Sequence, residues 1–292
     1  MVKVCVFGGS GFLGSHLADS LTKQGYDVTV FDSQKSLWLR EKQTMVIGDI
    51  MDQDTVEKVV KNSEIVYNFA AIADLNRCID EPKKSALVNV IGNINILEAC
   101  RKHHVKRFVF ASSIYVYSGQ GGFYKCSKQA SESYIEEYQK RFGLDFTILR
   151  FGSLYGPRCG EENTIHRMIK KAIEDGVVTY NGSPEAVRDY IHVHDAANAS
   201  VSILSEDFKN KNVILSGQQK IKVTELLNML ADILNQKCEI EVLDHEEEGH
   251  YVTTPYSFQP KFAEKYVPKS HIDLGQGLLR EIESFYVTRM KD

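Results

Sequence analysis

Three side chains near the middle of the chain have the types and the spacing of a proton-transfer site. Ser113 ends an apolar run, and Tyr124 and Lys128 stand four residues apart at the start of the next helical pattern. Residues at this spacing share one face of a helix. A free tyrosine has a pKa of about 10, which a nearby lysine ammonium and an oxidised nicotinamide would both lower. The pattern predicts Tyr124 as a base supported by Lys128, with Ser113 relaying a proton or holding the substrate oxygen.

A glycine-rich turn at the start of the chain predicts a dinucleotide site. Gly8, Gly11 and Gly14 follow the first apolar run directly and open the first helical pattern. A tight turn, a backbone close to a pyrophosphate and a helix packed on a strand all favour residues without a Cβ. The helix start around Phe12 and Leu13 offers free N–H groups and partial positive charge to phosphates. We expect these five residues to bind the cofactor, and a glycine turn without a ligand is the less favoured alternative.

Acidic positions after the next two apolar runs extend this prediction. Asp32 ends the second run, 18 residues after the last of these glycines, where a carboxylate can accept both ribose hydroxyls and would repel a 2′-phosphate. NAD is therefore favoured over NADP, although Lys35 and Arg40 leave a minority case for NADP. Asp49 and Ile50 follow the third run and are placed to meet the adenine, with an ordinary loop acid as an equally weighted alternative.

These side chains need a framework that brings strand ends together. The first half alternates apolar runs at 2–7, 28–31, 45–47, 65–69, 108–111 and 146–149 with helical patterns at 12–23, 54–61, 84–103 and 124–142. This repetition predicts an α/β fold, a Rossmann-type doubly wound parallel sheet that binds ligands at its carboxyl edge. The second half is less regular, with helical patterns at 164–174, 195–204, 224–234 and 274–285.

The same patterns predict two unequal parts. We expect an NAD-binding domain over residues 1–152, to which roughly 189–218 return. Residues 153–292 then form mainly a smaller, mixed α/β substrate-binding domain.

Composition narrows the class of protein. The chain has 292 residues, of which 43% are hydrophobic and 25% charged, and these fractions are typical of a folded globular protein. A net charge of −4 gives no basic field for nucleic acid or an anionic membrane. No apolar run approaches the roughly 20 residues of a membrane-spanning helix. The six cysteines are scattered without a Cys-x-x-Cys pair, so we expect no disulfide framework and a location in the cytoplasm.

Taken together, these motifs resemble the extended short-chain dehydrogenase/reductases, specifically the NAD-dependent epimerase/dehydratase family that acts on nucleotide sugars. The resemblance covers nearly the whole chain. Besides the glycine turn and the Ser/Tyr/Lys set, it rests on the segments Phe69-Ala70-Ala71, 89–93, 149–158 and 188–195.

The resemblance implies roles for several residues. Ser113, Tyr124 and Lys128 would form the catalytic triad, with Ser113 also touching the substrate and both Tyr124 and Lys128 touching the cofactor. Ala70 would contact the cofactor as well. Arg188 is similar to an arginine that binds the substrate diphosphate, where a planar guanidinium suits phosphate oxygens. The resemblance also places Asn163 and Ser153 among the substrate-binding residues.

Three departures from the family pattern bear on the reaction. Dehydratases and decarboxylases of the family carry acidic residues where this chain has Ile114 and Tyr115, so elimination and decarboxylation lose their acid or base. The glycine-rich loop 118–123 is shorter than in relatives. Ser153 stands where many epimerases have an asparagine at the diphosphate. Tyr115 is itself an alternative acid or base.

The sequence therefore predicts NAD-dependent epimerisation of a UDP-, GDP- or dTDP-linked sugar at C4, through a transient 4-keto intermediate. An NAD(P)H-dependent 4-keto-sugar reductase is the alternative, and a non-catalytic NAD-binding module is a third reading. The helices at 84–103 and 124–142 predict a homodimer, although covering the sheet also explains their apolar positions. His192 and His194 lack a third ligand at a fitting spacing, so we expect no metal.

Overall fold

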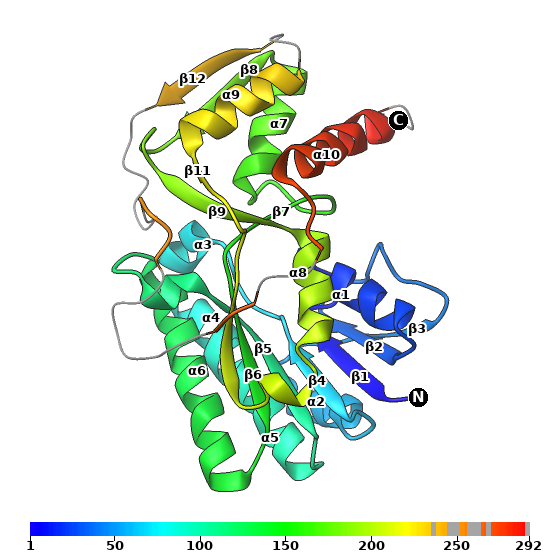
Figure 1. Ribbon diagram of the computed structural model, residues 1–292. Helices are drawn as coiled ribbons and strands as arrows, with labels where there is room; N and C mark the ends of the chain where they lie inside the picture. The colour runs from blue at the N-terminus through cyan, green and yellow to red at the C-terminus, as the bar shows by residue number, and fades with distance from the viewer. Residues whose placement is uncertain (235–237, 244–251, 256–263, 267–269, 290–292) are drawn as a thin grey trace.

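A central sheet of eight parallel strands organises the computed structural model of this chain (Figure 1). The structure describes residues 1–234, 238–243, 252–255, 264–266 and 270–289. In sheet order the strands are β13 (Glu264–Lys265), β10 (Lys211–Leu215), β6 (Phe146–Phe151), β5 (Arg107–Ser113), β4 (Ile65–Asn68), β1 (Lys3–Phe7), β2 (Asp27–Asp32) and β3 (Gln43–Ile47). The order 3-2-1-4-5-6, from the edge strand β3 to β6, is that of the Rossmann fold, as the sequence predicts.

Helices cover both faces of this sheet. On one face lie α1 (Phe12–Lys23) and α8 (Val193–Ser202), and on the other lie α2 (Gln53–Val60), α5 (Gly92–Lys102) and α6 (Gly122–Phe142). The side chains of β1 alternate between the two cores: Val4 and Val6 pack under α1 and α8, whereas Cys5 and Phe7 pack under α2, α5 and α6. This alternation explains why the buried strands read as continuous apolar runs.

The predicted helix at 84–103 is built from three segments. It begins as α4 (Pro82–Ala86), widens into a π-helical turn, η1 (Leu87–Ile91), and continues as α5. A short helix, α3 (Leu75–Asp80), precedes it and was not predicted. π-Turns are rare and occur frequently at functional sites.

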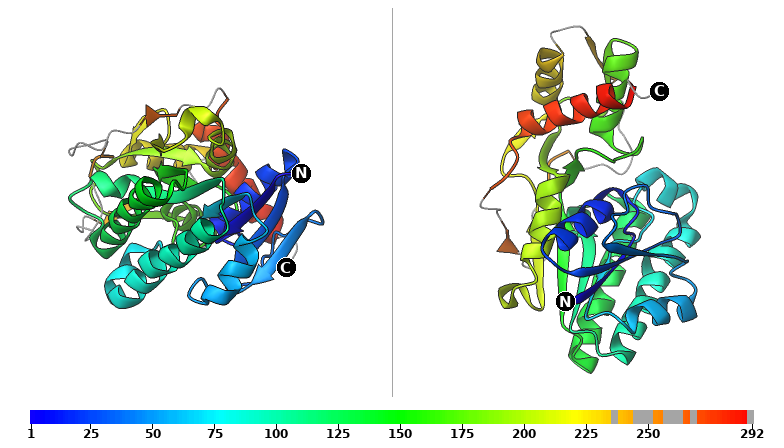
Figure 2. Two further views of the ribbon diagram at one scale, coloured as in Figure 1. Left: turned by 90° about the horizontal axis from the view of Figure 1, so that it is seen from below. Right: turned by 90° about the vertical axis from the view of Figure 1, so that its right-hand side faces the viewer.

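Beyond the sheet lies a smaller part with its own apolar core (Figures 1 and 2). It holds α7 (Thr164–Glu174), α9 (Val223–Ile233) and α10 (Leu274–Arg289). Two small sheets join them, one of β7 (Ser153–Tyr155), β9 (Val187–His192) and β11 (Lys220–Lys222), the other of β8 (Val177–Asn181) and β12 (Glu239–Leu243). Two 3₁₀ turns, η2 (Ile114–Tyr117) and η3 (Glu206–Phe208), complete the elements.

The predicted helices and strands of the first half agree with the structure to within a few residues. Most strands of the second half were not predicted, because they are short and pair with segments distant in sequence. Within 189–218, α8 and β10 lie on the central sheet, while β9 belongs to the three-stranded sheet. Among the helices of the described ranges, none combines the length and the apolar character needed to cross a membrane.

Candidate active site

The glycine turn between β1 and α1 brings backbone segments so close together that a side chain at Gly8 or Gly14 would clash with them. Gly8 has φ +77°, and a Cβ there would lie 2.5 Å from the backbone nitrogen of Ala70. A Cβ on Gly14 would lie 2.1 Å from the carbonyl oxygen of Gly8. The two glycines therefore allow α1 to start directly against the ends of β1 and β4.

The start of α1 is suited to an anion. Gly11 is the N-cap, no side chain caps the helix, and its first turn contains no acidic residue. The N–H groups of this turn can therefore bind phosphate oxygens. Asp32 lies beside the turn, where its carboxylate accepts hydrogen bonds from the backbone N–H groups of Ser10 at 3.0 Å and Gln34 at 3.1 Å.

A cavity of about 430 Å³ opens at this edge of the sheet. Six residues expected at the cofactor line it: Gly8, Gly11, Asp32, Asp49, Ile50 and Ala70. Leu13 and Gly14 do not line it; Leu13 packs on the core, and Gly14 is buried. The guanidinium of Arg40, which kept the NADP alternative open, pairs instead with Asp19 at 3.1 Å. These features fit a dinucleotide with a free ribose.

A second cavity, of about 320 Å³, lies between the sheet edge and the smaller part. Tyr124 and Ser113 both line its wall, where the Ser113 hydroxyl acts to lower the pKa of Tyr124. Phe12 lines this cavity rather than the first one. Ser113 ends β5 and Tyr124 lies in the first turn of α6, so the carboxyl edge of the sheet brings these two residues together.

Lys128 is buried one helical turn below Tyr124. Its Nζ donates a hydrogen bond to the carbonyl oxygen of Ala111 at 2.7 Å and lies 5.6 Å from the centre of the Tyr124 ring. Burial lowers the pKa of Lys128 to about 8. Desolvation also raises the pKa of Tyr124 to about 12, although the hydrogen bond from Ser113 opposes this shift. The predicted lowering of the Tyr124 pKa includes the charge of an oxidised nicotinamide and stays a prediction. In the protein alone, desolvation outweighs the polar contacts of Tyr124.

All four residues expected at the substrate line this second cavity: Ser113, Ser153, Asn163 and Arg188. Arg188 lies on β9, where one guanidinium nitrogen donates a hydrogen bond to the carbonyl oxygen of Val252 at 3.0 Å. Asn163 is the N-cap of α7. Its Oδ1 accepts from the N–H of His166, and its Nδ2 donates to the carbonyl oxygen of Leu154. Asn163 therefore has a structural role besides any contact with substrate.

The residues at the carboxyl edge of the central sheet belong to a segment that matches a known protein family. The NAD dependent epimerase/dehydratase family matches residues 4–216, which is more than half of the chain. The chain belongs to this family. The family uses NAD, in agreement with the expected cofactor.

Individual members of the family align with this chain over almost its whole length. A protein of Methanocaldococcus jannaschii, provisionally named a UDP-glucose 4-epimerase, is 30% identical over 96% of this chain and 97% of its own length. The dTDP-glucose 4,6-dehydratase of Mycobacterium tuberculosis is 26% identical over 97% of this chain and 92% of its own. Among solved structures, the UDP-glucose 4-epimerase of Thermotoga maritima with UDP-glucose is 27% identical, with a TM-score of 0.85 over 99% of this chain and 100% of that one. The chain is therefore an enzyme of the nucleotide-sugar epimerase/dehydratase type.

Two asparagines, Asn89 and Asn93, hold the loop that carries Ala70. Asn89, on the π-turn, accepts from the backbone N–H of Ile72 at 2.8 Å and donates to its carbonyl oxygen at 3.0 Å. Asn93 accepts from Asn68, whose own Oδ1 accepts from the N–H of Ala70. The segment 89–93 signalled the resemblance, but these contacts depend on the π-turn and were not predicted.

A buried ion pair was also missed. The Arg150 guanidinium and the Glu132 carboxylate lie 2.7 Å apart and are almost fully buried. Glu132 also accepts from Ser112 at 2.6 Å, and Arg150 bonds to the hydroxyl of Tyr117. This network ties α6, β6 and η2 to the residue beside Ser113. Ion pairing across 18 residues has no local sequence signature.

A lysine on the following helix, α6, holds the short loop 118–123 in place through hydrogen bonds. The Nζ of Lys125 donates to the carbonyl oxygens of Ser118 and Gly119. A Cβ on Gly121 would lie 2.7 Å from the ring of Tyr115, so this glycine lets the loop close over that ring. Tyr115 lines the second cavity and meets the ring of Tyr124 edge-on at 6.2 Å.

Proposed function

We propose that this chain epimerises a nucleotide sugar at C4 through a transient 4-keto intermediate. The observation that carries the proposal is that Ser113 and Tyr124 line one cavity wall, with the buried Lys128 beneath the tyrosine. NAD, when bound, supplies the hydride acceptor and donor, and its oxidised form adds a positive charge. Gly8, Gly11 and Asp32 would hold it, with Asp49 and Ile50 at the adenine.

The protein's own part is to move one proton. Tyr124 as phenolate takes the proton of the sugar 4-hydroxyl as the hydrogen on C4 leaves with its electron pair, and it returns that proton when hydride adds to the other face. Because desolvation raises the pKa of Tyr124 to about 12, the phenolate needs positive charge nearby. Lys128, whose pKa is about 8, still carries most of its charge at neutral pH. Ser113 holds the substrate oxygen.

Arg188 orients the substrate. A guanidinium binds diphosphate oxygens in a fixed geometry, and Arg188 faces the cavity that also contains Ser113 and Tyr124. Ser153 lines the same cavity on β7. We propose UDP-, GDP- or dTDP-sugars as substrates and assign NAD binding to the sheet and substrate binding mainly to 153–292. Ile114 and Tyr115 lack the carboxylates that elimination needs.

The first test removes only the phenolic oxygen of Tyr124. In Tyr124→Phe we expect turnover to fall by roughly 10²–10⁴-fold, the usual contribution of a general base, with NAD affinity unchanged. The matched control is Tyr286→Phe, an exposed tyrosine on α10, which should keep full activity. Products from a panel of UDP-, GDP- and dTDP-sugars would be resolved by NMR. Full activity of Tyr124→Phe would overturn the proposal.

The same panel distinguishes an epimerase from a keto-sugar reductase. An epimerase returns hydride to its own substrate, so NAD should survive dialysis and no net oxidation of NADH should occur. Loss of the cofactor on dialysis, with one NADH oxidised per sugar, would identify a reductase. Specific NAD binding without turnover of any sugar would indicate a binding module.

We also propose a homodimer through α5 and α6. The inner faces of these helices pack on the sheet, but Leu87, Ile91, Tyr134 and Phe142 expose between 39% and 54% of their surface on and beside them. Light scattering of the purified protein should give twice the chain mass, and Ile91→Glu should give the monomer. We propose a location in the cytoplasm, because the six cysteines are scattered along the sequence without a Cys-x-x-Cys pair.

A further inference from the structure

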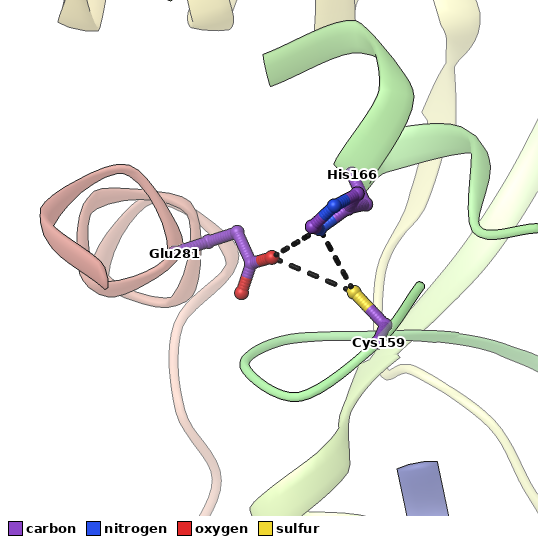
Figure 3. A group of neighbouring side chains, drawn as sticks. All are labelled: Cys159, His166 and Glu281. Atoms are coloured by element: carbon purple, nitrogen blue, oxygen red, sulfur yellow. Dashed lines mark hydrogen bonds and ion pairs between the residues drawn. The ribbon is translucent and has the colours of Figure 1, made fainter. Parts of the chain in front are cut away.

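Three metal-ligating side chains meet outside both cavities (Figure 3). Cys159 lies in the loop after β7, His166 in the first turn of α7, and Glu281 on α10. Their donor atoms point toward one another from segments separated by up to 122 residues. His192 and His194, the histidines weighed in the sequence, belong to no such group within the described part of the chain.

The distances between these donor atoms match a tetrahedral metal site. The Cys159 Sγ lies 3.5 Å from His166 Nδ1 and 3.5 Å from Glu281 Oε1, and the last two atoms lie 3.4 Å apart. Around tetrahedral zinc, the usual bond lengths give about 3.6 Å between sulfur and nitrogen or oxygen and about 3.3 Å between nitrogen and oxygen. All three observed edges agree with this geometry.

Burial adds a second, independent indication. The side chain of Glu281 is only 2% exposed, and its Oε2 has no hydrogen-bond partner within the described residues. A buried carboxylate oxygen without a partner is costly unless a cation compensates it. The neighbouring Cys159 is buried as well. A divalent ion would neutralise the carboxylate and a thiolate together, and the thiol proton would pass to solvent on binding.

We propose that Cys159, His166 and Glu281 bind a divalent transition-metal ion, for which Zn²⁺ best fits the mixed sulfur, nitrogen and oxygen donors. The ion ties α10 to α7 and to the loop before it. That loop leads into Asn163, in the wall of the second cavity. The metal therefore positions this wall and takes no part in the proton transfer at Tyr124. The proposal does not depend on the reaction assigned to the second cavity.

The test titrates chelator-treated full-length protein with Co²⁺ and then with Zn²⁺. It uses Cys126→Ser as the parent, which removes the one exposed cysteine and leaves Cys159 as the expected thiolate ligand. We expect one equivalent of Co²⁺, with the visible bands of a tetrahedral site and a thiolate-to-cobalt band in the near ultraviolet. Zn²⁺ should displace it. If the Co²⁺ spectrum of the Cys126→Ser parent lacks the thiolate band, the proposal is overturned. This result does not depend on whether the ligand variants fold.

The ligand variants provide the second readout. Cys159→Ser and Glu281→Gln, each in the parent, should weaken Zn²⁺ binding by more than about a hundredfold, because even the partners of metal ligands contribute about 10–100-fold. Glu283→Gln, an exposed glutamate on the same helix, is the matched control and should bind one equivalent. Isothermal titration calorimetry would measure the affinity and the stoichiometry of Zn²⁺ binding in the ligand variants and in the control. Undiminished Zn²⁺ binding in the two ligand variants would show that these side chains form a hydrogen-bonded cluster only.

Discussion

The first cavity, where we propose that NAD binds, and the second, where we propose that the nucleotide sugar binds, are built on opposite principles. The first is formed by backbone: a glycine turn, an uncapped helix start and loops at the ends of neighbouring parallel strands. The second is formed by side chains from β5, α6, β7, α7 and β9, which come from both parts of the molecule. A backbone site depends on close approach, whereas a side-chain site depends on the contacts that hold each group in position. The two cavities should therefore respond to different substitutions.

The largest effect is expected where side chains support the catalytic strand. In Glu132→Gln, the buried guanidinium of Arg150 loses its counter-charge while the shape of the side chain is kept. Breaking a buried pair in this way costs about 3–5 kcal/mol. Urea unfolding should show this loss, together with reduced turnover, because Glu132 also accepts from Ser112 beside Ser113.

The control for this prediction is an exposed pair on the same sheet. Glu64→Gln breaks the contact with Lys106, whose side chain is 73% exposed, and should cost about 0–1 kcal/mol. Equal losses in Glu64→Gln and Glu132→Gln would show that burial does not set the strength of these pairs.

A slightly smaller effect is expected from one methyl group in the backbone-built cavity. In Gly14→Ala the new Cβ would lie 2.1 Å from the Gly8 carbonyl, so α1 must shift away from β1. We expect a loss of about 3 kcal/mol in the free energy of unfolding and of most NAD affinity. Gly11→Ala is the comparison, since its Cβ meets only the Gly8 oxygen at 3.3 Å. Similar losses in both variants would contradict the close-approach argument.

The junction between the two parts should respond to pH. His16 on α1 hydrogen-bonds to the carbonyl oxygen of Pro157, and burial lowers the pKa of His16 to about 4. An unfolded histidine has a pKa of about 6.5, so the unfolded chain takes up this proton first as the pH falls. The stability is therefore complete above about pH 6.5 and declines toward pH 4.

The His16→Gln variant measures that contribution. Between pH 7 and pH 5 it should lose about 2 kcal/mol less stability than the wild type, as followed by urea unfolding. His271→Gln, an exposed histidine, should keep the wild-type pH dependence. An unchanged pH dependence in His16→Gln would mean that His16 titrates as freely in the folded protein as in the unfolded one.

The two cavities also differ in how much of them the sequence predicts. The glycine turn, Asp32 and the strand ends form one local pattern. Five of the six expected cofactor residues in this cavity therefore came from spacing, and Ala70 came from the family resemblance. Ser113, Tyr124 and Arg188 were recognised as single positions, but their contacts come from elements far apart. The π-turn under Asn89, the Glu132–Arg150 pair and the cluster around Cys159 arise only from tertiary packing. The spacing of Tyr124 and Lys128 likewise carries no information about the desolvation that raises the pKa of Tyr124.

The smallest effect is expected from Arg188→Lys in the side-chain-built cavity. Lysine keeps the charge but loses the planar fork that contacts two phosphate oxygens at once. We expect KM for the nucleotide sugar to rise about tenfold, or about 1.4 kcal/mol, while kcat and NAD affinity change little. Arg77→Lys, in the lining of the cofactor cavity, should leave this KM unchanged. If Arg188→Lys instead weakened NAD and spared KM, the division of the site into two independent cavities would be wrong.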